Sequence, residues 1–102
     1  MTTITPEEVK TRLDKGETLH LIDVREPYEN DEFNIGGKLL PLGEIQSMQI
    51  EDIEHLKNEE VILYCRSGNR SGIAARFLDQ LGFKNTKNLV GGMLAWIDKF
   101  KV

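Results

Sequence analysis

The stretch Val61-Ile-Leu-Tyr-Cys-Arg-Ser-Gly-Asn-Arg70, continued by Ser71-Gly-Ile-Ala-Ala-Arg76, decides the fold of this 102-residue chain. Four apolar residues lead directly into the only cysteine, a short polar loop follows, and apolar residues then recur at helical spacing. The pattern predicts a buried strand over residues 61–64 and a helix over residues 71–81. Because a helix N-terminus carries partial positive charge and unpaired N–H groups, the junction between them is typical of an anion site.

The loop itself has the composition expected around a reactive thiol. Cys65 is flanked by Arg66 and Arg70, and its pKa should fall beside arginine and a helix N-terminus. Gly68 permits a positive φ, so that successive N–H groups can converge on one anion. Further donors come from the polar side chains Ser67, Asn69 and Ser71. A thiolate, a persulfide, a sulfur oxyanion and phosphate are all candidates for that anion.

A plainer interpretation competes with this one. A lone cysteine after an apolar strand is often only a small core residue, and polar residues between two elements often form a solvated turn. Arginines and a glycine at a strand-to-helix junction favour the reactive thiol. In that reading Ser71 is the expected N-cap of the following helix.

Composition bounds the function. The chain is 39% apolar and 29% charged, with 13 basic and 17 acidic residues and a net charge of −4. An acidic chain offers no overall attraction to nucleic acid or to an anionic membrane. No apolar run approaches the roughly 20 residues that a membrane span needs, and Met1–Pro6 lacks the pattern of a signal peptide. We therefore expect one cytoplasmic domain over residues 1–102.

The count of metal-binding side chains is small. A single cysteine excludes an internal disulfide and a cysteine-rich metal site. The two histidines, His20 and His55, show no metal-ligand spacing with it. We expect neither a bound metal nor another cofactor.

The rest of the chain alternates strands with helices. Thr5, Pro6 and Glu8 form a capping box that predicts a helix start. The other expected elements are a strand at 19–24, a turn and short helix at 25–32, a strand at 38–41, one or two short helices within 42–56, a strand at 85–90 and a helical face over 93–100. This alternation predicts an α/β fold with a parallel sheet, whose ligands bind beyond the carboxyl ends of the strands.

Four blocks of residues resemble the rhodanese-like domains, in particular the small single-domain sulfurtransferases. They are Leu21-Ile-Asp-Val-Arg-Glu-Pro-Tyr-Glu29, Cys65-Arg-Ser-Gly-Asn-Arg-Ser71, Ala74-Ala-Arg-Phe-Leu78 with Leu81-Gly-Phe83, and Val90-Gly-Gly-Met-Leu-Ala-Trp96. The blocks stand in the order of the family and span nearly the whole chain. The resemblance implies a five-stranded, mostly parallel sheet flanked by helices on both faces.

The resemblance also implies a chemistry. Cys65 would accept a sulfane sulfur from thiosulfate or another persulfide donor and carry it as a persulfide. The loop from Arg66 to Arg70, with Ser71, would bind that sulfur through backbone N–H groups. The acceptor would be cyanide, a small thiol or a protein cysteine, since the chain has no second cysteine to resolve the persulfide. The alternative within the family is a binding, sulfur-carrier or sensor module without turnover.

Two departures from related patterns matter. Many relatives carry His-Ile-Pro-Gly-Ala where this chain has Asn34-Ile-Gly-Gly-Lys38. This difference lies in a structural loop and hardly affects the predicted chemistry. Dual-specificity phosphatases of similar architecture need five residues between the cysteine and the arginine, whereas four separate Cys65 from Arg70. The shorter loop should suit one sulfur atom better than phosphate, so phosphatase or arsenate reductase activity is the less favoured alternative.

Several polar residues near the predicted site have structural explanations. We expect Asp23 to accept backbone N–H groups or pair with Arg25, and Glu44 to be a surface charge. Gly91 and Gly92 are explained by a turn, although they could border the pocket.

Overall fold

One parallel sheet of five strands forms the centre of the protein. A computed structural model describes residues 1–101, and its strands lie in the order β1-β5-β4-β2-β3. All four neighbouring pairs are parallel, so the predicted α/β architecture is confirmed and the sheet contains no antiparallel strand within the described residues. The strands are β1 (Thr2–Ile4), β2 (Leu21–Asp23), β3 (Lys38–Leu39), β4 (Glu60–Tyr64) and β5 (Asn85–Leu89).

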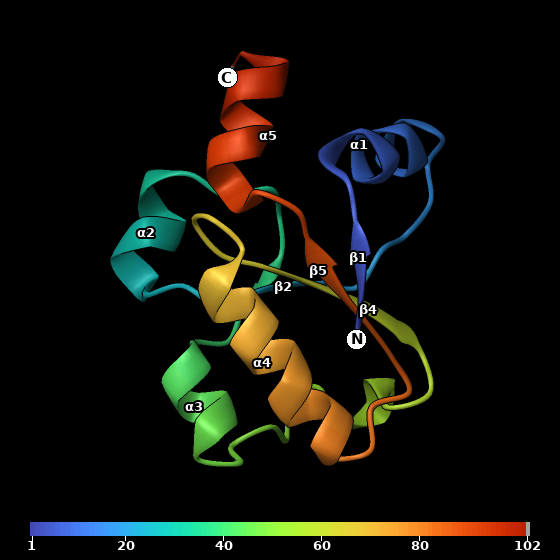
Figure 1. Cartoon of the computed structure of the whole chain (residues 1–102), viewed down its shortest axis with the longest axis vertical. Coiled ribbons are helices and arrows are strands. Elements are labelled where there is room, and N and C mark those ends of the chain that lie inside the picture. The colour runs from blue at the N-terminus through green and yellow to red at the C-terminus, as the bar shows by residue number, and fades with distance from the viewer. Residues whose placement is uncertain (102) are drawn as a thin grey trace.

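Helices cover both faces of this sheet, as Figure 1 shows. They are α1 (Pro6–Asp14), α2 (Pro27–Glu32), α3 (Leu42–Gln46), α4 (Asn69–Gln80) and α5 (Gly92–Phe100), with a 3₁₀ turn at Glu54–Leu56. The capping box predicted for α1 is present, because Glu8 N–H donates to the Thr5 hydroxyl and Thr5 N–H donates to the Glu8 carboxylate. None of the helices in residues 1–101 is long and apolar enough to span a membrane.

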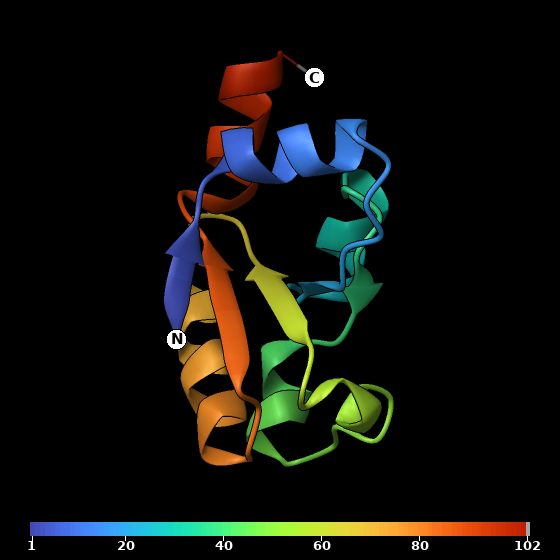
Figure 2. The same cartoon turned by 90° about the vertical axis from the view of Figure 1, so that its right-hand side faces the viewer.

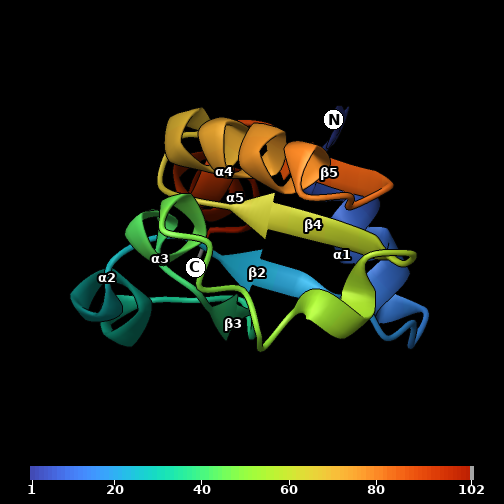
Figure 3. The same ribbon diagram turned by 90° about the horizontal axis from the view of Figure 1, so that it is seen from below.

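The strand β4 is central, and its side chains alternate between two hydrophobic cores. Figure 3 shows β4 between β5 and β2. Val61 and Leu63 pack into the core under α3 and α4, whereas Ile62 and Tyr64 pack into the core under α1 and α5. Side chains along a strand point alternately to opposite faces, so the next residue, Cys65, lies on the α4 side.

All strands point toward one end of the molecule. In Figure 2 the arrowheads of β1, β5 and β4 are directed toward the end where α5 begins. Ligands of parallel α/β sheets bind at this carboxyl end. The loop that follows β4 therefore lies where the alternation of strands and helices places a binding site.

Element boundaries differ from the prediction in three main places, of which the first is the strand predicted over 38–41, which ends at Leu39. The strand predicted over 19–24 is shortened to Leu21–Asp23, although His20 and Val24 on either side of it still form backbone hydrogen bonds with β4. The helix predicted from residue 71 begins at Asn69. The earlier start follows from Gly68, whose left-handed backbone makes it the N-cap three residues before Ser71.

Candidate functional site

Cys65 lies directly after β4 and is almost completely buried. Its exposed fraction is 1%, and it belongs to the core cluster of Val61 and Leu63. The first turn of α4 begins four residues later, at Asn69. The chain therefore turns back so that the beginning of α4 lies over the sulfur atom.

Hydrogen-bond donors of the loop converge on the Cys65 sulfur. The Gly68 N–H donates to Sγ at 3.1 Å, and the Ser71 hydroxyl lies 3.4 Å from Sγ. Burial raises the pKa of Cys65, but hydrogen bonds from the Ser71 hydroxyl and from the N–H groups of Ser71, Gly68 and Ser67 lower it by more. The net pKa lies below the ordinary value of a thiol, as the position of the loop predicts.

Gly68 makes the tight turn that this convergence requires. Its φ is +102°, in the left-handed region that glycine adopts without strain, and it is the N-cap residue of α4. The prediction that Ser71 caps the helix is therefore wrong. Ser71 lies inside α4 and is fully buried, with its hydroxyl turned toward the sulfur.

The beginning of α5 holds the other side of the loop. Met93 N–H donates to the Cys65 carbonyl at 2.9 Å, and Leu94 N–H donates to the Arg66 carbonyl at 3.0 Å. Gly92 has a φ of +56°, and a Cβ atom there would lie 2.6 Å from the Arg66 carbonyl oxygen and even closer to that of Cys65. Gly91 and Gly92 thus border the site, and a turn alone does not explain Gly92.

The two loop arginines have different environments. Arg70 makes a bidentate ion pair with Glu29 of α2, with N···O distances of 2.7 and 2.8 Å. This hydrogen-bonded pair lowers the pKa of Glu29 to about 2 and raises that of Arg70. The sequence places both arginines beside the thiol, and in the structure the charge of Arg70 is compensated by Glu29.

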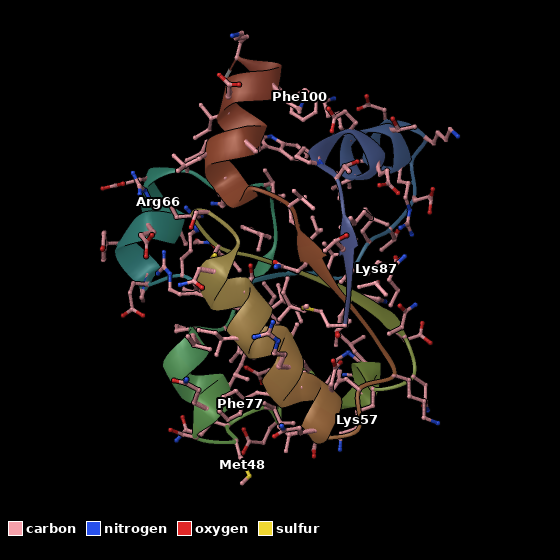
Figure 4. The ribbon with its side chains drawn as sticks, viewed as in Figure 1. Met48, Lys57, Arg66, Phe77, Lys87 and Phe100 are labelled. Carbon is pink, nitrogen blue, oxygen red and sulfur yellow. The ribbon has the colours of Figure 1, made fainter. Side chains whose placement is uncertain are left out.

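Arg66 is the exposed arginine of the loop. Figure 4 shows its side chain next to α2, and it has no ion-pair partner among residues 1–101. It lines a cavity of about 160 Å³ together with Glu32 of α2 and Leu94 of α5. The exposed side chains of Ser67 and Asn69 belong to the same loop.

Asp23 and Arg25 form a buried structural pair at the end of β2. Asp23 is fully buried and accepts hydrogen bonds from the Arg25 backbone N–H, from the Arg25 guanidinium and from Asn30. Arg25 also donates to the Phe33 carbonyl. The structural role expected for Asp23 is confirmed, since its oxygens are occupied by these donors. No cluster of three metal-binding side chains exists in the part of the chain that the structure describes.

Sequence reasoning missed two contributors to the site, Glu29 and Asn88. Glu29 stands at the end of the first block that resembles the family, but its partner Arg70 lies 41 residues away in the sequence. Asn88 of β5 accepts from the Ser71 hydroxyl and donates to the Gly68 carbonyl, although nothing in the local pattern of β5 marks it. For Gly92, the sequence favours a turn and leaves a place at the border of the pocket open, and the structure shows its close approach to the loop carbonyls. The one sequence signal for Glu29 is its position. It is an acidic residue in the first turn of α2, the helix that follows β2.

Comparison with known proteins gives a consistent result. The model of the rhodanese-like domain matches residues 5–99. The chain is 38% identical to a protein named "Sulfurtransferase" from Allochromatium vinosum, covering 91% of this chain and 85% of that one. It is 39% identical to "Putative sulfur carrier protein YrkF" from Bacillus subtilis, covering 94% of this chain.

The structural comparison agrees with the sequence comparison. A crystal structure of a rhodanese-like domain protein from Staphylococcus aureus superposes with a TM-score of 0.83 at 31% identity, over 94% of this chain and 91% of that one. The chain spans only part of the first curated relatives that it matches, 51% of one and 24% of another.

The contact between Gly92 and the loop predicts the effect of adding one methyl group. Gly92→Ala should destabilise the protein, because the left-handed conformation alone costs a non-glycine residue about 1–3 kcal/mol and the Cβ would collide with loop carbonyls. Urea unfolding measures the loss. Gly43→Ala is the matched control, since no atom lies within 4 Å of a Cβ there. Equal stability of the two variants would contradict the proposed packing.

The ion pair between Glu29 and Arg70 predicts a dependence of stability on pH. The pKa of Glu29 is about 2 in the folded protein and about 4.3 when unfolded. Its contribution is therefore complete above about pH 5 and is lost as the pH falls toward 2. Glu29→Gln should lower stability at pH 7 and make the loss of stability between pH 5 and 2 shallower, as measured by urea unfolding.

Glu60→Gln is the control for the ion pair at the loop. The pKa of Glu60 is also about 2, because it pairs with Arg12 and Lys87 far from Cys65. Both substitutions should reduce the loss of folding stability between pH 5 and 2. Only Glu29→Gln should change the rate at which iodoacetamide alkylates Cys65. An unchanged pH slope in Glu29→Gln would refute the assignment.

Proposed function

Since this chain belongs to the rhodanese-like domain family, we propose that it is a sulfurtransferase in which Cys65 carries a sulfane sulfur as a persulfide. Members of the family transfer or carry sulfur. The observation that supports the proposal most directly is the convergence of loop donors on a single buried sulfur atom. A thiolate that is stabilised at neutral pH is the nucleophile that such a transfer needs.

In the first step the Cys65 thiolate attacks the outer sulfur of thiosulfate or of another persulfide. A bond forms between Cys65 Sγ and that sulfur, while the bond between the two donor sulfurs breaks. Sulfite, or a thiolate, leaves with the electron pair. The product is a Cys65 persulfide with its negative charge on the outer sulfur, and the loop N–H groups are available to stabilise that charge.

In the second step an acceptor attacks the outer sulfur of the persulfide. The S–S bond breaks and the Cys65 thiolate is regenerated with the electron pair. Cyanide would give thiocyanate, and a thiolate would give a new persulfide. Cys65 is the only cysteine in these 102 residues, so the acceptor is a small molecule or a protein cysteine outside these residues.

Arg66 is the residue best suited to attract an anionic donor. Its guanidinium is exposed and borders the cavity beside the loop, whereas the charge of Arg70 is compensated by Glu29. The net charge of −4 otherwise repels anions. We propose that Arg66 provides local attraction for thiosulfate, and that Arg70 holds the loop against α2.

A sulfur-carrier module without efficient turnover is the second candidate. The relative YrkF carries that description in its name, and the 1% exposure of Cys65 restricts access to its sulfur. In either role the thiol must stay reduced, which suits the cytoplasm. Phosphatase chemistry is less well supported, because four residues between Cys65 and Arg70 make a small loop and the Arg70 guanidinium is already bound by a carboxylate.

Intact-mass measurement tests the proposal at one atom. The protein incubated with thiosulfate should gain the mass of one sulfur atom, and added cyanide should remove that sulfur as thiocyanate. Cys65→Ser should show no gain, and treatment with sulfite alone should leave the native chain unchanged.

The same experiment separates the candidates. A persulfide that forms and turns over with cyanide or a small thiol supports the enzyme. A persulfide that forms but is released only to a protein thiol supports the carrier. Absence of any adduct, with thiosulfate and with a small-molecule persulfide, would refute both roles, and hydrolysis of an aryl phosphate that is lost in Cys65→Ser would instead revive the phosphatase reading.

A further inference from the structure

The side chain of Asn88 connects two parts of the site that are distant in sequence. Asn88 lies on β5, beside the turn into α4. Its Nδ2 donates to the Gly68 carbonyl at 3.0 Å, and its Oδ1 accepts from the Ser71 hydroxyl. The Gly68 carbonyl can only accept, so the amide nitrogen must face Gly68 and the amide oxygen must face Ser71.

The Ser71 hydroxyl therefore has two acceptors and one proton. Asn88 Oδ1 is one acceptor, and Cys65 Sγ, 3.4 Å from the hydroxyl oxygen, is the other. Ser71 is fully buried, so no bulk water competes for this proton. While Cys65 is a thiol, the amide oxygen is the stronger acceptor. When Cys65 is a thiolate, the charged sulfur is the stronger acceptor.

We propose that Asn88 is a positioning residue that controls the acidity of Cys65 through Ser71, by competing with the sulfur for the single proton of the Ser71 hydroxyl. Asn88 does not touch the reacting sulfur. This role of Asn88 rests on the proposed function, because the Cys65 thiolate is the nucleophile of the first step. In the persulfide the negative charge lies on the outer sulfur, so Cys65 Sγ becomes a weak acceptor. The Ser71 hydroxyl then donates its hydrogen bond to Asn88 again.

The charged groups around Cys65 leave this competition intact. Arg70 of α4 is paired with Glu29 of α2, and Arg25 is paired with Asp23 at the end of β2. Arg66 follows Cys65 in the chain and is exposed. None of these groups hydrogen-bonds to Ser71 or Asn88 among residues 1–101. The position of the Ser71 proton is therefore decided by Asn88 and the sulfur.

A double-mutant cycle between Asn88 and Ser71 tests the proposal. The readout is the pKa of Cys65, measured by ultraviolet thiolate absorbance against a Cys65→Ser blank in each background. Asn88→Ala should lower the pKa by about 0.5 unit or more, because the Ser71 proton then has only the sulfur to bond. In the Ser71→Ala background the same substitution should not lower the pKa.

A merely structural role gives a different result. If Asn88 only ties down Gly68, its loss loosens the loop, weakens the N–H bonds to the thiolate and raises the pKa equally in both backgrounds. An increase, an equal change in both backgrounds or no change overturns the proposal. Circular dichroism confirms folding, and Asn88→Ser replaces Asn88→Ala if the latter does not fold, since its shorter side chain cannot reach Ser71 and Gly68 together.

The cycle is independent of sulfur transfer. It needs no sulfur donor, so a chain that never forms a persulfide would refute the proposed function and still report the coupling between Asn88 and Ser71. Conversely, a chain that transfers sulfur with no such coupling would leave the function standing and refute the role of Asn88.

Discussion

The hydrogen bonds from the start of α5 to the carbonyls of Cys65 and Arg66 fix the geometry on which the rest of the site depends. Met93 and Leu94 donate them, and Gly92 allows the helix to approach that closely. Because these two carbonyls point toward α5, the N–H groups that follow in the loop are free to face the sulfur. The N–H groups at the start of α5 thus bind backbone carbonyls, whereas the N–H groups that converge on Cys65 Sγ lie in the loop and at the start of α4.

A second consequence concerns charge. Among residues 1–101, the groups that lower the pKa of Cys65 through hydrogen bonds are backbone N–H groups and one hydroxyl. Such donors stabilise a small anion at short range without attracting large polyanions. The ion pair with Glu29 compensates the charge of Arg70, which would otherwise attract a wider range of anions to the loop. We propose that this environment suits a single sulfur anion better than phosphate, as the short loop predicts.

The local sequence pattern predicted the strand and the helix on either side of Cys65, but not the side chains that hold the loop in place. The alternation of Val61, Leu63 and Cys65 is readable from sequence, because a strand has a fixed period of two. The start of α4 was misplaced because a glycine in the left-handed region can cap a helix as well as serine can. Glu29 and Asn88 were missed because their contacts join segments 41 and 17 residues apart, and such pairing depends on how the strands are ordered in the sheet.

The most direct test of this account is the pKa of Cys65 in the native chain against that of the same chain in denaturant. Thiolate absorbance reports it cleanly, since Cys65 is the only cysteine and Cys65→Ser supplies the blank. The convergence of loop donors predicts a lower pKa in the folded protein than in the unfolded one. A folded-state pKa equal to or above the unfolded value would show that burial outweighs the donors, and would contradict the claim that this loop is built to hold a sulfur anion.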